Sequence, residues 1–96
     1  MSIQLVVRFN VKEDQVNAFV EIMKGSKERI LAADGCSGVD VLHSSDDPNV
    51  VLLSEKWESK ESHDVYADKM RESGALNKLA DFLTDQPSQE LYFIKE

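Results

Sequence analysis

The fold of this chain is decided by one eight-residue stretch, Val50-Val-Leu-Leu-Ser-Glu-Lys-Trp57. Side chains alternate across a β-strand, so Val51, Leu53, Glu55 and Trp57 share one face. That face begins with aliphatic residues and ends with a carboxylate beside the only tryptophan of the chain. Because burying a carboxylate without a partner is costly, the pattern predicts a cavity mouth or an interface rather than a sealed core.

Two strands and a helix are predicted before this stretch. Residues 3–10 alternate between apolar and polar side chains, which is typical of a strand. Asp14 or Glu13 can cap a helix that reaches about Ala33, because apolar residues recur there at helical spacing. Residues 39–44 alternate again, and the turn-forming segment after them predicts a hairpin with the 50–57 strand.

A broken helix and a last strand are predicted after the stretch. Ser59 can cap a helix, the pair Ser73-Gly74 interrupts it, and a further helical stripe runs to Leu83. Residues 91–94 form the last predicted strand. The order βαββααβ predicts a single α+β domain over residues 1–96, with a ferredoxin-like fold and one four-stranded antiparallel sheet.

The predicted strands carry apolar residues on both faces. Val6 lies opposite Leu5, Leu42 opposite Val41, and Tyr92 opposite Leu91. An antiparallel sheet with one solvated face should instead alternate cleanly with polar residues. The helices can cover only one face, so we expect the other face to pack against a second copy of the chain, forming a homodimer.

Composition narrows the possible partners and the compartment. The net charge of −7 disfavours binding to nucleic acid, and no apolar stretch is long enough to cross a membrane. The first residues do not read as a secretory signal, and the single cysteine, Cys36, fits a reducing, cytoplasmic environment. We expect no metal and no cofactor, because metal-ligand spacings and nucleotide-binding motifs are missing from the sequence.

The segment Glu55-Lys-Trp57-Glu-Ser-Lys-Glu61, which leads from a strand into a helix, resembles the antibiotic biosynthesis monooxygenase (ABM) family. This family belongs to the dimeric α+β barrel proteins. The resemblance implies a ferredoxin-like protomer, a homodimer made by packing two sheets face to face, and a pocket between sheet and helices. It also implies relatives that oxygenate quinols or polyketide aromatics without metal or flavin, although a shared fold does not fix the chemistry.

The chain departs from the family at one position. Members commonly carry a histidine nine residues after the tryptophan, where this chain has Tyr66, and the nearest histidine is His63, one turn earlier. Haem-degrading members carry an asparagine early in the first strand, whereas Asn10 lies at the end of that strand. Haem is therefore disfavoured.

Five residues are candidates for a catalytic site, and each also has a structural interpretation. Trp57 is either an aromatic pocket wall or a core residue, and Glu55 is either an acid/base group or one half of an ion pair. His63 is either a base or a surface histidine. Tyr66 is either a hydrogen-bond donor to a substrate oxyanion or packing, and Asn10 is a further possible donor.

The sequence thus predicts a cofactor-independent monooxygenase that acts on a quinol or phenolic aromatic small molecule and O₂. The first alternative is a non-catalytic dimeric module that binds a small hydrophobic metabolite. The second is an isomerase of a small sugar phosphate, which the net charge of −7 disfavours.

Overall fold

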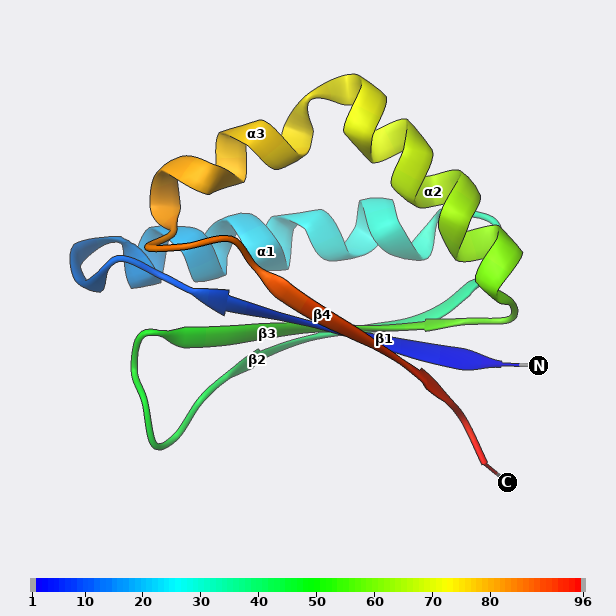
Figure 1. The fold of residues 1–96 in the computed structure, drawn as a ribbon, viewed down its shortest axis with the longest axis horizontal. Helices are drawn as coiled ribbons and strands as arrows, with labels where there is room; N and C mark the ends of the chain where they lie inside the picture. Colours follow the sequence, from blue (N-terminus) through cyan, green and yellow to red (C-terminus); the bar gives the residue numbers. More distant parts are fainter. Residues whose placement is uncertain (1, 96) are drawn as a thin grey trace.

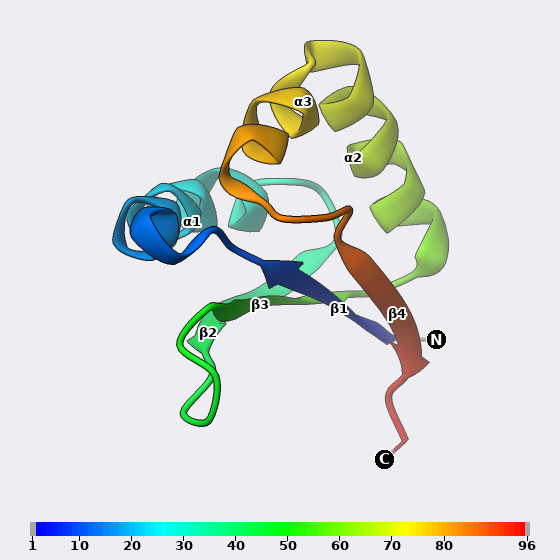
Figure 2. The same ribbon diagram turned by 60° about the vertical axis from the view of Figure 1, so that its left-hand side comes forward.

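The computed structural model describes residues 2–95 as a four-stranded antiparallel sheet with its helices on one face (Figures 1 and 2). The strands lie in the order β2-β3-β1-β4, and their bounds are β1 Ile3–Asn10, β2 Cys36–His43, β3 Val50–Trp57 and β4 Ser88–Phe93. The predicted ferredoxin-like α+β fold is confirmed.

The register of the central strands sets the inner face of the sheet. Ile3 of β1 pairs with Trp57 of β3, and Leu5 pairs with Glu55. The strand residues Val51 and Trp57 are fully buried on that face, as the alternation of the 50–57 stretch predicts. The inner face of β3 is therefore the floor on which the helices pack.

Three helices cover that floor, and two short 3₁₀ turns extend them (Figure 2). Their bounds are α1 Val16–Leu31, α2 Lys60–Ser73 and α3 Ala75–Leu79, with 3₁₀ turns at Glu13–Gln15 and Ala80–Phe82. Helix α1 buries its apolar stripe against the sheet, with the ring of Phe19 packed edge-on to the ring of Phe9 at a centroid distance of 5.0 Å. This packing is the apolar core of the domain.

The predicted ends of α2 are confirmed. The Ser59 hydroxyl accepts a hydrogen bond from the backbone N–H of Ser62 at 3.2 Å, as an N-cap residue should. Gly74 ends the helix in the left-handed region, with φ of 75°. Helix α2 therefore begins one residue after its cap and stops where the sequence breaks its apolar stripe.

Other boundaries differ from the prediction. Neither Asp14 nor Glu13 caps α1 through its side chain; both lie in the 3₁₀ turn before it, and α1 ends at Leu31. Strand β2 runs over Cys36–His43, so it begins before the predicted start at residue 39 and includes the single cysteine of the chain. Strand β4 begins at Ser88, earlier than predicted. Its first half is polar and lacks the apolar alternation by which a strand is recognised in a sequence, but backbone pairing with β1 makes it part of the sheet.

The outer face of the sheet carries a mixture of apolar and polar side chains. Register places Val6, Leu42, Leu52 and Tyr92 on this face together with Lys56, among other polar residues. Both views show this face without a covering helix (Figures 1 and 2). Within residues 2–95, no helix is long and apolar enough to cross a membrane.

Candidate active site

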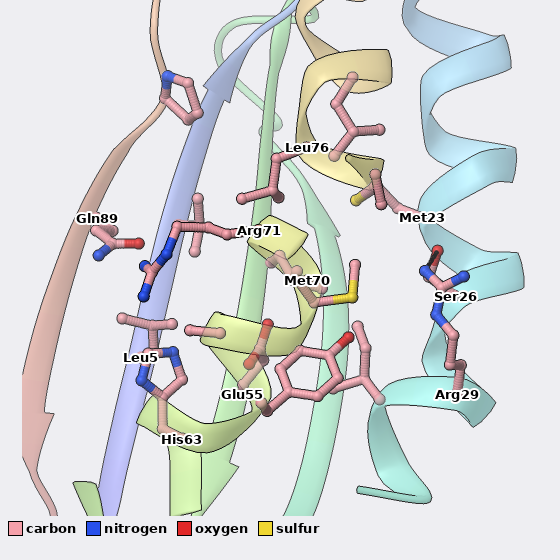
Figure 3. Close-up of a pocket in the computed structure, with 18 of the residues that line it drawn as sticks. Leu5, Met23, Ser26, Arg29, Glu55, His63, Met70, Arg71, Leu76 and Gln89 are labelled. Atoms are coloured by element: carbon pink, nitrogen blue, oxygen red, sulfur yellow. Dashed lines mark hydrogen bonds between the residues drawn. The ribbon is translucent and has the colours of Figure 1, made fainter. Parts of the chain in front are cut away.

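A cavity of about 730 Å³ lies between the inner face of the sheet and the three helices (Figure 3). Its walls are largely apolar and come from β1, β3, β4, α1, α2 and α3. The apolar lining includes Leu5, Val7, Met23, Leu53, Met70 and Leu76. Volume and apolar walls of this kind are typical of a small-molecule site.

Glu55 is the buried acidic group of this cavity. Its residue is 5% exposed, and one carboxylate oxygen, Oε1, accepts a hydrogen bond from Nε1 of Trp57 at 2.9 Å. The two residues meet because positions two apart on a strand point to the same side. Burial raises the pKa of Glu55 above its ordinary value, while the Trp57 N–H and the nearby His63 partly oppose that rise.

His63 reaches the same cavity from the first turn of α2. Its side chain is 13% exposed, and its ring packs edge-on to the Trp57 ring at 5.7 Å between centroids. Nδ1 lies 3.4 Å from Oδ1 of Asp64, within ion-pair distance, but without the alignment of a hydrogen bond. Within the described chain, this buried ring nitrogen therefore has no hydrogen-bond partner.

Tyr66 lies one turn further along α2 and also lines the cavity. Its ring tilts against Trp57 at 5.3 Å between centroids. Burial and the negative charge of Glu55 raise the pKa of the Tyr66 phenol, and Arg29 partly opposes that rise. Tyr66 is thus a protonated hydrogen-bond donor at neutral pH, close enough to Glu55 and Arg29 for their charges to matter.

Three of the predicted site residues therefore meet in the cavity, and two do not. Trp57 is fully buried beneath the site, where it packs against His63 and Tyr66 and holds Glu55, and it is not among the lining residues. Asn10 also lies outside the lining: its side-chain amide donates to Oδ1 of Asp85 at 3.1 Å. The ion-pair interpretation of Glu55 is wrong, because its side-chain partner is the indole N–H.

Sequence reasoning missed the basic residues of the cavity. Arg29 of α1, Arg71 of α2 and Lys78 of α3 all line it. Each occupies an exposed position on its own helix, so helical periodicity alone gives no signal for it. Over residues 2–95, the structure contains no group of three His, Cys, Asp or Glu side chains placed to hold a metal ion.

Comparison with known proteins places this geometry in context. Residues 2–69 match the sequence model of the family described as antibiotic biosynthesis monooxygenase. A search of curated protein sequences gives no match.

Solved structures share the fold at low sequence identity. A conserved protein from Methanosarcina mazei is 22% identical, with a TM-score of 0.88 over 99% of this chain and 94% of its own. Rv0793 from Mycobacterium tuberculosis is 18% identical, with a TM-score of 0.87 over 100% of this chain and 97% of its own. A variant of SnoaB, a cofactor-independent oxygenase from Streptomyces nogalater, is 13% identical, with a TM-score of 0.84 over 99% of this chain and 94% of its own. The family match covers more than half of the sequence, so the chain belongs to the antibiotic biosynthesis monooxygenase family.

Proposed function

We propose that the protein is a cofactor-independent monooxygenase that acts on a quinol or phenolic aromatic molecule. The observation that carries the proposal is the buried carboxyl of Glu55 in the floor of an apolar cavity, oriented by the Trp57 N–H at 2.9 Å. Apolar walls can pack against a planar aromatic ring. Burying a carboxylate among apolar side chains costs stability, which favours a catalytic role for Glu55 over a purely structural one.

The first step is removal of a phenolic proton. Burial raises the pKa of Glu55, which makes its carboxylate a stronger base than an exposed one. The Trp57 N–H fixes one carboxylate oxygen, Oε1, so Oε2 is the oxygen left to take the proton. His63, whose Nδ1 is buried without a hydrogen-bond partner among the described residues, is the alternative acceptor.

The anion that forms is stabilised by a hydrogen-bond donor from α2, close to Glu55. The Tyr66 phenol stays protonated, because its pKa is raised, and its O–H can donate to the substrate oxyanion. Tyr66 stands at the position where members of the family commonly carry a histidine. A tyrosine donor stabilises the anion but does not itself remove the proton.

The oxidation balances without an external reductant. One atom of O₂ enters the ring carbon of the quinol and the other leaves as water, so a quinol and O₂ give a hydroxyquinone and H₂O. The substrate supplies all the electrons, and the two hydrogens lost from it end in the water molecule. The protein need only hold the substrate, move the proton and exclude solvent.

Oxygen uptake with 1,4-dihydroxynaphthalene, followed with an oxygen electrode, tests the proposal. Glu55→Gln keeps an acceptor for the Trp57 N–H but removes the base, and general-base loss typically costs about 10²-fold or more in rate. Glu61→Gln, an exposed change outside the cavity lining, is the matched control and should retain wild-type uptake. In the same assay, a larger loss for His63→Ala than for Glu55→Gln would assign the base to the histidine.

Uptake by the wild type at the buffer rate with several quinols would contradict the monooxygenase proposal. Binding of an aromatic ligand without oxygen uptake would then favour the non-catalytic binding module. The sugar-phosphate alternative is the weakest, because the hydroxyl groups of a sugar need hydrogen-bonding partners and the sheet side of the cavity offers mainly apolar side chains such as Leu5, Val7 and Leu53.

We further propose that two copies pack through their outer sheet faces as a homodimer. Support comes from the apolar side chains of Val6, Leu42, Leu52 and Tyr92, which register gathers on a face that the helices leave open. Leu42 and Tyr92 are 48% and 47% exposed in the single chain. Burial of such side chains is the usual driving force for a stable dimer.

A further inference from the structure

The cavity carries more positive charge than the chain as a whole. The sequence has a net charge of −7, yet three of its eleven basic residues line this one cavity. They come from three helices, α1, α2 and α3, and so converge only in the folded chain.

Three acidic side chains, Glu55, Asp64 and Asp68, also line the cavity, and one of them pairs with one of its cations. Asp68 pairs with Arg71, and Asp64 pairs with Lys60, which lies outside the lining, at 2.8 Å. Glu55 lies in the floor of the cavity, where its Oε1 accepts a hydrogen bond from the Trp57 N–H at 2.9 Å. Two of the three acidic side chains of the lining, Asp64 and Asp68, are therefore already paired with a basic side chain.

Two cations remain without an acidic partner. Within residues 2–95, neither Arg29 nor Lys78 forms an ion pair with a carboxylate. The Arg29 guanidinium donates a hydrogen bond to the Ser26 hydroxyl at 3.3 Å and lies close to the Tyr66 phenol. Figure 3 shows Arg29 and Arg71 on opposite sides of Glu55, with the Arg29 side chain running along α1 to Ser26.

We propose that the cavity takes aromatic substrates that carry a carboxylate, which Arg29 binds while Lys78 adds to the positive potential. This inference rests on the proposed function in one respect, namely that the ligand is the molecule oxygenated above Glu55. A guanidinium matches a carboxylate in geometry and can bind it through two parallel hydrogen bonds. Arg29 also lies close enough to the Tyr66 phenol to influence it, so a carboxylate held there places the ring beside Tyr66 and Glu55.

The inference can be tested by binding, without turnover. Isothermal titration calorimetry would compare 2-naphthoate with 2-naphthamide, two ligands of similar shape that differ in charge. We expect the wild type to bind the carboxylate about tenfold more tightly, as a charge-assisted hydrogen bond provides. Arg29→Gln should remove most of this preference, Lys78→Gln should reduce it less, and Arg29→Lys should restore part of it.

The matched control is Lys24→Gln, which makes the same change of charge on α1 outside the cavity lining. It should keep the wild-type preference. Equal affinity for the two ligands, no binding of 2-naphthoate, or equal effects of Arg29→Gln and Lys24→Gln would each overturn the inference. Failure of the two proposals is distinguishable, because Arg29-dependent naphthoate binding can persist in a protein that consumes no oxygen, and oxygen uptake with neutral quinols can persist without any preference for carboxylates.

Discussion

At the scale of single residues, the Glu55–Trp57 pair is the feature that connects sequence to chemistry. The strand places the two side chains on one face, the helices bury them, and the indole N–H becomes the partner of the carboxyl. A buried carboxyl held in this way costs stability that a purely structural site would not need. Loss of activity and gain of stability on the same substitution would therefore identify a functional group.

Glu55→Gln should make the protein more stable relative to the wild type as the pH rises. The folded-state pKa of Glu55 lies above that of an unfolded glutamate, which is about 4.3, so the folded state binds more protons between these two values. The wild type accordingly loses stability as the pH rises through that window, and the variant has no group to lose a proton. Urea unfolding of both proteins from about pH 4.5 to 8 measures the difference.

The difference in the free energy of unfolding, variant minus wild type, should grow with pH and then level off above the folded-state pKa. Taking a difference cancels the other titrating groups, which the two proteins share. A difference that stays constant across the range would show that Glu55 titrates alike in the folded and unfolded chains.

At the scale of the elements, α2 brings His63 and Tyr66 to the cavity, and its start is fixed by the loop that leaves α1. The backbone carbonyl of Gly35 accepts a hydrogen bond from the N–H of Glu58 at 2.8 Å, just before the Ser59 cap. Gly35 has φ of 89°, and a Cβ built there would lie 2.5 Å from the Ser62 hydroxyl oxygen. This close approach sets where the helix with the site residues begins.

Gly35→Ala should therefore destabilise the fold more than Gly74→Ala. Both glycines have positive φ, which costs an alanine about 1–2 kcal/mol, but only the alanine at position 35 would also meet Ser62. Added crowding in a packed region typically costs about 1–3 kcal/mol more. Thermal and urea unfolding of the two variants would measure the difference.

Gly25→Ala is the control for the substitution itself. Gly25 lies inside α1 with open space around the position of a Cβ, so alanine should stabilise the helix by about 1 kcal/mol. Equal losses of stability in the Gly35 and Gly74 variants would show that contact with Ser62 adds nothing to the backbone strain.

At the scale of the whole molecule, the sheet divides the protein into two faces with different uses. The inner face and the helices enclose the cavity, and the outer face has no covering element within residues 2–95 (Figure 2). A mixed apolar and polar face is more consistent with an interface than with a fully solvated surface. The dimer proposal belongs to this scale.

Leu42→Arg should convert the protein from dimer to monomer in sedimentation velocity, because it places a charge in the proposed interface. The wild type should sediment at about twice the chain mass of 10.8 kDa at micromolar concentration. Leu31→Arg is closely matched, since Leu31 is 42% exposed and Leu42 is 48% exposed, but Leu31 lies at the end of α1, away from the outer face. This control should remain a dimer; a monomeric wild type, or a dimeric Leu42 variant, would contradict the proposal.

The sequence by itself determined the elements and the floor of the site. Alternation over residues 50–57 placed Glu55 and Trp57 on one buried face, and the cap at Ser59 and the break at Gly74 bounded α2. These features are local, because strand periodicity, capping and glycine conformation depend on neighbours within a few positions. Helical spacing likewise put His63 and Tyr66 on a common side of α2.

Only the tertiary structure decided which side chains share the cavity. Trp57 lies beneath the site rather than in its wall, Asn10 bonds to Asp85 instead, and Arg29 joins the lining from another helix. Each of these outcomes depends on how separate elements pack, and an exposed arginine on one helix has the same sequence pattern whether or not another helix faces it. The early start of β4 also depends on packing between separate elements. Its first residues are polar and show no strand periodicity in the sequence, and only their pairing with β1 makes them part of the strand.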